Sequence, residues 1–225
     1  PKKGDNAGVR RVVNFKGLNK NCTRNAHTTV DTFKQVTSIP KCNEGEKMLF
    51  NTLDAWNGYH SIIVDEADKN FLTFITEWGR YRYTRAAQGF LGSGDAYTYA
   101  YDQIQNNISD LSPKYKHLLV TEGGVKHWRR CIDDTVAWTS NLWDCFKQMW
   151  MIVWSCGVQG IVFNPRKIQF AMEEVDTFGF TIGQKGIKPT SEFITAVRNF
   201  PLPTDIKQTR AFFGLINQCT YAMNE

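Results

Sequence analysis

Residues 131–138 read Cys-Ile-Asp-Asp-Thr-Val-Ala-Trp, and they place two adjacent carboxylates, Asp133 and Asp134, between apolar segments. The pattern of residues 125–138 predicts a hairpin that lifts this pair to the edge of a buried sheet. Two neighbouring ionised carboxylates repel each other, and folding tolerates them where water or a cation lies between them. Most Asp-Asp pairs are ordinary turn residues, so the surroundings must decide between a turn and a functional site.

A third carboxylate, Asp54, ends another apolar segment at residues 47–54. Three hard oxygen donors at neighbouring strand ends suit Mg²⁺, which proteins commonly hold through few carboxylates together with substrate phosphates. Two such ions about 4 Å apart are the usual centre for phosphodiester synthesis. Asp54, Asp133 and Asp134 are therefore candidate ligands for two Mg²⁺ ions, with Mn²⁺ as an alternative, and ordinary turn residues are the other interpretation.

The composition is that of an ordinary globular protein. The 225 residues are 42% hydrophobic and 22% charged, which suits one large domain or two joined lobes. The net charge of +5 permits a nucleic-acid partner without requiring one. The most apolar run, residues 149–156, is too short for the ~20 residues of a membrane span, so we expect no membrane partner. Six cysteines match no zinc module and predict a reduced, intracellular protein.

Strand and helix patterns are mixed without the regularity of βαβ units, which predicts an α+β fold. Strands are expected at residues 12–15, 47–54, 71–76 and 80–83, with a hairpin turn at Gly79 and a further small hairpin within 178–189. Helices are expected at residues 94–108, 141–158, 191–199 and 205–222.

Two aromatic-rich segments each allow a structural and a functional interpretation. In the predicted helix 141–158, helical periodicity places five apolar side chains on one face: Trp143, Phe146, Met149, Trp150 and Val153. We predict that this stripe faces the core rather than a ligand. In residues 78–85, arginines alternate with aromatic residues, a pattern shared by nucleic-acid-binding strands and by solvated edge strands. We favour the edge strand.

Seven segments spread over nearly the whole chain form one ordered series: residues 12–20, 53–60, 88–90, 131–134, 163–167, 178–180 and 210–215. They include Leu-Asp-Ala-Trp-Asn-Gly-Tyr-His at 53–60 and Phe-Asn-Pro-Arg-Lys at 163–167. The series resembles the motifs of reverse transcriptases from gypsy-type LTR retrotransposons, whose paired-aspartate motif is usually Tyr-x-Asp-Asp. Seven matches in order at compatible spacing are hard to explain by chance.

The resemblance implies a right-hand polymerase fold, with an antiparallel palm sheet backed by helices, fingers, and the start of a helical thumb. The implied division is fingers at 1–46, palm at 47–70, fingers hairpin and loop at 71–92, palm at 93–189 and a truncated thumb at 190–225. Because the chain starts at Pro1 without Met and stops in a helix-like stretch, we expect it to be part of a longer Pol polyprotein.

The implied activity is RNA-directed DNA polymerisation, in which a nucleotidyltransferase adds deoxynucleotides to a primer 3′-end by two-metal phosphoryl transfer. The implied partners are an RNA or DNA template with its primer, deoxynucleoside triphosphates, and the RNase H and integrase domains of the same polyprotein. Copying would take place in the cytoplasm, for example in virus-like particles, or in the nucleus.

The resemblance also implies roles for individual residues. Asp54 and Asp133 would bridge the metal ions and Asp134 would assist. Lys167 would lie near the leaving pyrophosphate as a general acid, or would be a solvated surface lysine. A nucleotide-binding group would comprise Lys3, Arg10, Ala55, Tyr59, Gln88 and Gly89, with the Tyr59 ring excluding a ribose 2′-hydroxyl. The primer grip would comprise Phe178, Gly179 and Phe180.

Two positions depart from the family pattern. Cys131 replaces the usual tyrosine, and Ala87 stands where proline often precedes Gln-Gly. An alternative interpretation is a catalytically impaired or domesticated domain that binds nucleic acid, but the three intact aspartates argue against it. A related RNA-dependent RNA polymerase is a third interpretation. Tyr59 argues against it, because such an enzyme must admit the 2′-hydroxyl.

Overall fold

The computed structural model describes residues 12–24, 27, 31–43, 45–111, 113–122 and 124–220. The chain forms two compact units. The first unit comprises residues 1–29, 56–107 and 156–162, and the second comprises residues 30–55, 108–155 and 163–225.

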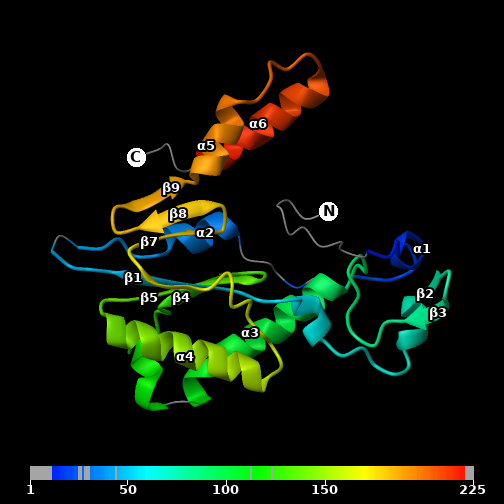
Figure 1. Ribbon diagram of the computed structural model, residues 1–225, viewed down its shortest axis with the longest axis horizontal. Coiled ribbons are helices and arrows are strands. Elements are labelled where there is room, and N and C mark those ends of the chain that lie inside the picture. The colour runs from blue at the N-terminus through cyan, green and yellow to red at the C-terminus, as the bar shows by residue number, and fades with distance from the viewer. Residues whose placement is uncertain are drawn as a thin grey trace. The chain divides into compact units, whose positions relative to one another are not determined.

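The second unit is built on a four-stranded antiparallel sheet with strand order β4-β5-β1-β6 (Figure 1). Its strands are β1 (Leu49–Asp54), β4 (Trp128–Cys131), β5 (Asp134–Thr139) and β6 (Gln169–Met172). Strand β1 is buried along almost its whole length, as expected for a central strand that ends on a carboxylate. The predicted strand at 47–54 and the predicted hairpin around residues 131–134 are therefore confirmed.

Helix α4 (Leu142–Val158) runs along one face of this sheet (Figure 1). Two buried amides join the helix to the strands. The Asn51 Nδ2 donates to the Cys145 carbonyl at 2.9 Å, while the Asn51 Oδ1 accepts from the Ala171 N–H at 3.1 Å. The Gln148 Nε2 donates to the carbonyls of Leu118 at 2.7 Å and Trp138 at 3.1 Å. These bonds satisfy polar groups that would otherwise destabilise the core.

The opposite face of the sheet packs on α2 (Thr32–Thr37) and on a three-stranded sheet of β7 (Glu174–Thr177), β8 (Phe180–Gly183) and β9 (Gly186–Pro189). The shared core consists of buried apolar side chains from these elements, namely Val36, Ile39, Phe50, Val136, Trp138, Val175 and Ile182. The small hairpin expected within residues 178–189 is confirmed as β8 and β9.

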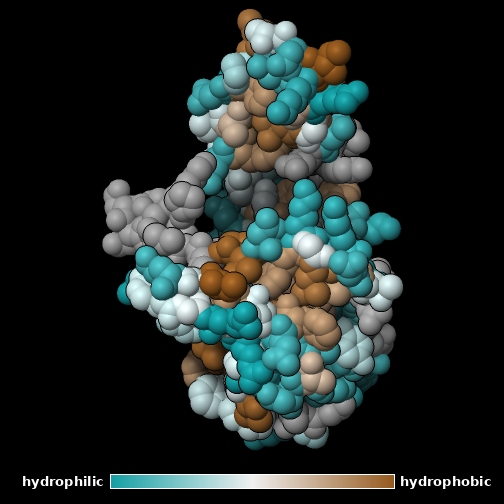
Figure 2. Space-filling model, turned by 90° about the vertical axis from the view of Figure 1, so that its right-hand side faces the viewer, coloured by the Kyte–Doolittle hydropathy of each residue, from teal (hydrophilic) through white to brown (hydrophobic). Residues whose placement is uncertain are grey.

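Helices α5 (Ser191–Arg198) and α6 (Ile206–Thr220) end the second unit, close to the predicted bounds. The Thr190 side chain caps α5 by accepting from the Phe193 N–H at 3.3 Å. Phe200 and Phe212 pack with their ring centroids 5.2 Å apart. Figure 2 shows hydrophobic residues on the surface of this helix pair, at the top of the view, and Leu202 and Ile206 are indeed exposed.

The first unit contains α1 (Lys16–Asn19), η1 (Gly58–Ser61), η2 (Lys69–Leu72), β2 (Thr73–Thr76), β3 (Gly79–Arg82) and most of α3 (Ser93–Leu111). The β2–β3 hairpin is confirmed, and Gly79 has the positive φ of 133° that the turn requires. Strand β3 is exposed throughout, in agreement with a solvated strand. In the described part of the chain, no helix is long and apolar enough to cross a membrane.

The strand predicted at residues 12–15 is wrong. These residues form no strand, and the chain continues into α1, where the Asn14 Oδ1 accepts from the Lys16 N–H at 3.0 Å. Phe15 packs in a cluster with Leu72, Tyr83 and Ala87. The β-branched residues that suggested a strand lack a ladder partner among the described residues, and burial of Phe15 decides the local structure instead.

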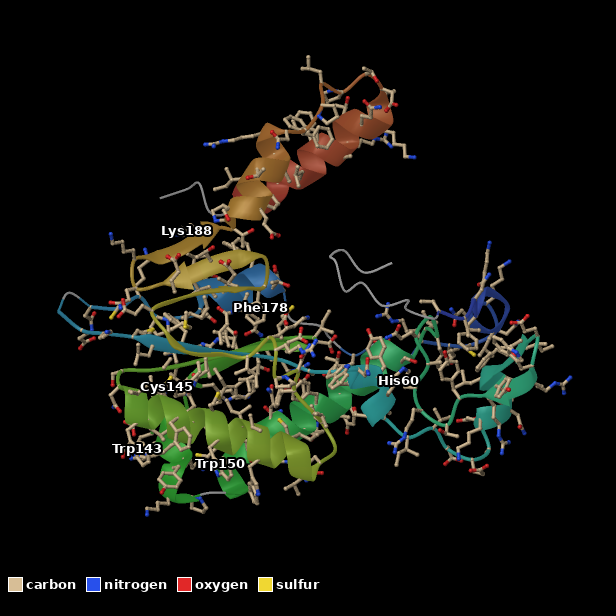
Figure 3. The ribbon with its side chains drawn as sticks, viewed as in Figure 1. His60, Trp143, Cys145, Trp150, Phe178 and Lys188 are labelled. Atoms are coloured by element: carbon tan, nitrogen blue, oxygen red, sulfur yellow. The ribbon has the colours of Figure 1, made fainter. Side chains whose placement is uncertain are left out.

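The prediction that the α4 aromatic stripe faces the core is also wrong. Trp143 is 65% exposed, Trp150 is 60% exposed, and Phe146 is exposed as well. The face against the sheet carries Cys145 and Gln148 instead, because these smaller or amide side chains allow close packing and hydrogen bonding. Figure 3 shows Cys145 on the side of α4 toward the sheet, and Trp143 and Trp150 on the opposite side.

Replacing Asn51 by Leu tests the amide link between β1 and its neighbours. The variant keeps the size of the side chain but leaves the Cys145 carbonyl and the Ala171 N–H buried without their partner. We expect Asn51→Leu to lower the free energy of unfolding by about 2–4 kcal/mol, measured by urea denaturation followed by circular dichroism. The control Asn43→Leu removes an exposed amide and should change it by less than ~0.5 kcal/mol. Equal effects of the two variants would contradict the role of Asn51.

Candidate active site

The turn between β4 and β5 consists of Ile132 and Asp133, because Cys131 pairs with Asp134 in the ladder. Ile132 has a φ of 55°, which is unfavourable for a β-branched residue. Two hydrogen bonds hold this strained turn. The Arg130 Nη1 donates to the Ile132 carbonyl at 2.7 Å, and the Ala55 N–H donates to the Asp133 carbonyl at 2.9 Å. The second bond fixes Asp133 to the end of β1.

The register of β1 and β5 places Asp54 directly opposite Asp134. The expectation that the strands carrying these aspartates are neighbours is therefore confirmed. The two side chains share a hydrogen bond, and the pKa of Asp134 is raised to about 6. Burial is the largest cause, followed by the negative charge of Asp54, and the charge of Asp133 adds to it. Near neutral pH the pair therefore holds more negative charge than its surroundings favour.

Lys167 supplies a positive charge to this cluster. Its Nζ lies 2.7 Å from the Asp54 Oδ2 and lowers the pKa of Asp134 in opposition to the other groups. The preceding segment binds the end of β1, because the Asn164 N–H donates to the Asp54 carbonyl at 2.8 Å. The Lys167 side chain is 61% exposed while that of Asp54 is 21% exposed. Lys167 is thus an ion-pair partner of Asp54 with access to solvent.

A cavity of about 430 Å³ opens beside these residues. Asp54, Asp134 and Lys167 line it. Sequence reasoning missed further polar lining residues, namely Thr52, Arg166, Gln169, Asp176 and Thr177. The position of Arg166 next to Lys167 in the sequence could have predicted that it lies near the site. Asp176 lines the cavity because of the tertiary position of β7, which the sequence pattern does not indicate. Carboxylates and cations lining one cavity suit a ligand that combines metal ions with phosphates.

The carboxylates fit a divalent cation that substrate helps to bind. Among the residues that the structure describes, no group of three or more His, Cys, Asp or Glu side chains forms a ready-made metal cage. Mg²⁺ rarely needs one, since it is usually held by one or two carboxylates plus substrate phosphates. Asp54 and Asp134 offer facing hard oxygen donors. Burial, and then the charge of Asp54, raise the pKa of Asp134, so its ionised form is disfavoured in a way that a bound cation would relieve.

The residues predicted to bind the nucleotide fall in different parts of the chain. Lys3 and Arg10 lie outside the described residues. Ala55 is buried in the second unit, where its N–H binds the turn of Asp133. Tyr59, Gln88 and Gly89 belong to the first unit. Their position relative to the carboxylates stays a prediction.

Tyr59 and Gly89 have well-defined local surroundings in the first unit. The Tyr59 ring meets the buried Tyr97 ring edge to face, with centroids 5.6 Å apart. Gly89 has a φ of 97°, and a Cβ there would lie 2.7 Å from the Val13 carbonyl oxygen. The Gly89 carbonyl accepts from the Asn19 side chain at 2.9 Å. Only glycine fits this close approach.

The predicted primer-grip residues form the β7–β8 turn, where Phe178 and Gly179 both have positive φ. With Phe180 they line a cavity of about 470 Å³ that also includes the start of α2. In α2, the Thr32 Oγ1 lies 3.1 Å from the Cys131 Sγ. The thiol that replaces the usual tyrosine is thus hydrogen-bonded to the helix that borders this cavity.

The sequence is similar to a known protein family and to known proteins over most of its length. The family described as reverse transcriptase (RNA-dependent DNA polymerase) matches residues 1–182. The chain is 25% identical over 219 residues to a retrovirus-related Pol polyprotein from transposon 297 of Drosophila melanogaster, covering 96% of this chain and 19% of that protein. It is 24% identical to the polyprotein from transposon gypsy of the same species, covering 93% and 18%. The chain thus spans about a fifth of the length of these relatives.

Comparison with solved structures confirms the α+β polymerase-like fold. A foamy viral protease-reverse transcriptase in complex with double-stranded DNA has a TM-score of 0.78 at 22% identity, covering 93% of this chain and 33% of that chain. The foamy viral protein in complex with an RNA/DNA hybrid has a TM-score of 0.72 at 21% identity, covering 92% and 25%. The detailed division into fingers, palm and thumb stays a prediction.

The raised pKa of Asp134 predicts how stability depends on pH in metal-free buffer. An unfolded Asp titrates near pH 4, so between about pH 4 and about pH 6 the folded state binds more protons than the unfolded state. Stability therefore falls as the pH rises through this window. We expect Asp134→Asn to raise the melting temperature at neutral pH and to have little effect near pH 4, measured by calorimetry.

Asp144 provides a control of opposite sign. Hydrogen bonds from Lys147 and then Asn141 lower its pKa, so its charge stabilises the folded state above the unfolded pKa. Asp144→Asn should lower the melting temperature at neutral pH, with the loss shrinking as the pH falls. A lower melting temperature of Asp134→Asn at neutral pH would refute the crowding of charge at Asp54 and Asp134.

Proposed function

The chain belongs to the reverse transcriptase (RNA-dependent DNA polymerase) family, and from this premise we propose that it is the polymerase domain of a retrotransposon Pol polyprotein. It would add deoxynucleotides to the 3′-end of a primer, copying an RNA or DNA template. The observation that carries the proposal is that Asp54 pairs with Asp134 in the sheet, next to the turn in which the Asp133 carbonyl accepts a hydrogen bond from Ala55. A site of this kind needs three carboxylates held at one sheet edge.

The metal-binding role is assigned to these carboxylates. Asp54 and Asp133 would hold two divalent ions, Mg²⁺ or Mn²⁺, and Asp134 would assist. When bound, such ions activate the primer 3′-hydroxyl and stabilise charge on the triphosphate and the leaving pyrophosphate. The chain itself contributes the fixed direction of the ligands, because the hydrogen bond from Ala55 to Asp133 prevents the turn from moving away from β1.

Lys167 is proposed to act on the leaving group. Its ammonium group, paired with Asp54 at 2.7 Å, has the exposure to reach a bound pyrophosphate and donate a proton to it. Arg166 lines the same cavity and would bind phosphate as a fixed charge. Both cations reach the site because the loop at 163–167 is anchored to the end of β1.

The remaining predicted residues are assigned to substrate binding. Lys3 and Arg10 would hold the triphosphate, and Ala55, Tyr59, Gln88 and Gly89 would surround the incoming nucleotide. The turn of Phe178 and Gly179 with Phe180 would position the primer. RNase H and integrase domains of the same polyprotein are proposed partners, as is an intracellular site of copying. The alternative of an impaired nucleic-acid-binding domain makes the opposite prediction for catalysis.

Primer extension tests the proposed activity. With poly(rA)/oligo(dT), dTTP and Mg²⁺ or Mn²⁺, we expect the chain to extend the primer. Asp54→Asn and Asp133→Asn should each reduce the rate by roughly 100-fold or more, because ligands matter at least as much as the groups that orient them. The control Asp68→Asn changes an exposed carboxylate whose side chain makes no capping hydrogen bond to η2, and it should leave the rate unchanged. Wild-type extension no faster than that of Asp133→Asn would support the impaired domain.

Sugar selection tests the role of Tyr59. Truncation to alanine removes the ring that would exclude a 2′-hydroxyl, so Tyr59→Ala should incorporate ribonucleotides roughly 10- to 100-fold better relative to deoxynucleotides. Tyr59→Phe keeps the ring and should keep the selectivity. The control Tyr81→Ala changes an exposed ring on β3. If Tyr59→Ala leaves the incorporation ratio at the wild-type value, the assignment of Tyr59 fails, although the polymerase proposal stands.

A further inference from the structure

The outer face of α4 carries a stripe of exposed aromatic side chains, which we call the α4 stripe: Trp143, Phe146, Trp150 and Trp154. They recur at intervals of three and four residues, so they form one line along the helix. Soluble monomers rarely expose contiguous apolar surface of this kind, and larger patches mark interaction sites. The stripe plays no part in the proposed active site.

The rings of the α4 stripe are ordered against one another and against their neighbours. Trp143 and Phe146 stack with centroids 5.5 Å apart and an interplanar angle of 12°. Phe146 meets Phe170 edge to face at 6.5 Å. Beside them lies a cavity of about 600 Å³, lined by Lys114, Tyr115, Lys147 and Met151 together with the first three stripe residues. The stripe therefore presents a shaped apolar surface rather than isolated side chains.

The charge around the α4 stripe favours a protein partner over nucleic acid. Lys147 forms an ion pair with Asp144 at 2.9 Å and lies 5.5 Å from the centroid of the Trp143 ring. Its charge is thus already balanced within the chain. Nucleic acid is bound mainly through several free cations on phosphates, whereas the core of a protein interface is aromatic and depleted of charge.

We propose that the α4 stripe binds the same stripe of a second copy of this chain, in an antiparallel arrangement. The four rings are spaced almost symmetrically about the level of Gln148. In an antiparallel pair, Phe146 therefore meets Trp150 of the other copy, and Trp143 meets Trp154. A surface that is complementary to itself in this way is the requirement of a twofold dimer.

The exposed area is compatible with such a dimer. Each ring is about half exposed or more, which corresponds to roughly 100 Å² per aromatic side chain. The four rings of both copies then supply about half of the ~1,600 Å² that a standard interface buries. Leu142, Phe170 and Tyr115 border the stripe, and they contribute further area.

The oligomeric state of the whole chain tests the proposal. Sedimentation or light scattering over the micromolar range should give twice the monomer mass for the wild type. Phe146→Glu and Trp150→Lys should each give the monomer mass, because each places a charge in the centre of the interface. The control Trp78→Lys changes a tryptophan of the first unit that is more exposed than Trp150, and it should leave the dimer intact. Circular dichroism shows that each variant folds.

Mixing the two variants tests the antiparallel register. In a mixed dimer, Glu at position 146 of one copy faces Lys at position 150 of the other, and the second pair is Trp150 with Phe146 as in the wild type. The mixture should therefore regain the dimer mass that neither variant has alone. A wild type that stays monomeric over the micromolar range overturns the proposal. Failure of the mixture to dimerise overturns the antiparallel arrangement.

Discussion

The ladder between β1 and β5 is the constraint on which the rest of the structure depends. Its register puts Asp54 opposite Asp134, Phe50 opposite Trp138 and Asn51 opposite Ala137. A slip of one residue would move every side chain of β1 to the other face of the sheet. Asn51 would then lie in the apolar core on the side of α2, and Asp54 would lose its partner. Burial and chemistry therefore specify the same register.

Several contacts beyond the ladder hold this register. Asn51 can satisfy both of its amide groups only when it faces α4 and β6. At the other end of the strand, the Ala55 N–H and the Asp54 carbonyl bind Asp133 and Asn164. These backbone hydrogen bonds at the end of β1 restrict the positions of Asp54 and Asp133. The same arrangement leaves Ile132 with an unfavourable positive φ, and the hydrogen bonds around the turn compensate for this backbone strain.

Secondary structure could be predicted correctly where the residue pattern of a single segment determines it. The bounds of β1, of the hairpin at 131–134 and of α4 follow from local patterns. The structure places the Lys167 Nζ 2.7 Å from Asp54, and the catalytic role of Lys167 stays a prediction. Prediction from sequence failed where distant segments decide. Gln148 is buried because its side-chain amide donates to the carbonyls of Leu118 and Trp138. These acceptors lie outside α4, so the residue pattern of the helix alone cannot predict them. The same distant packing leaves Trp143 and Trp150 outside.

The electrostatics of the site follow from the asymmetry of its two facing carboxylates. Asp54 has Lys167 as an ion-pair partner, whereas burial and the charge of Asp54 raise the pKa of Asp134 to about 6. A cation entering between them would displace the proton of the protonated Asp134 carboxyl and compete with the ammonium group of Lys167 for Asp54. Release from Asp54 would leave Lys167 free to bind an anion in the same cavity. One local charge imbalance would thus couple the carboxylates to the cations that are proposed to bind phosphate.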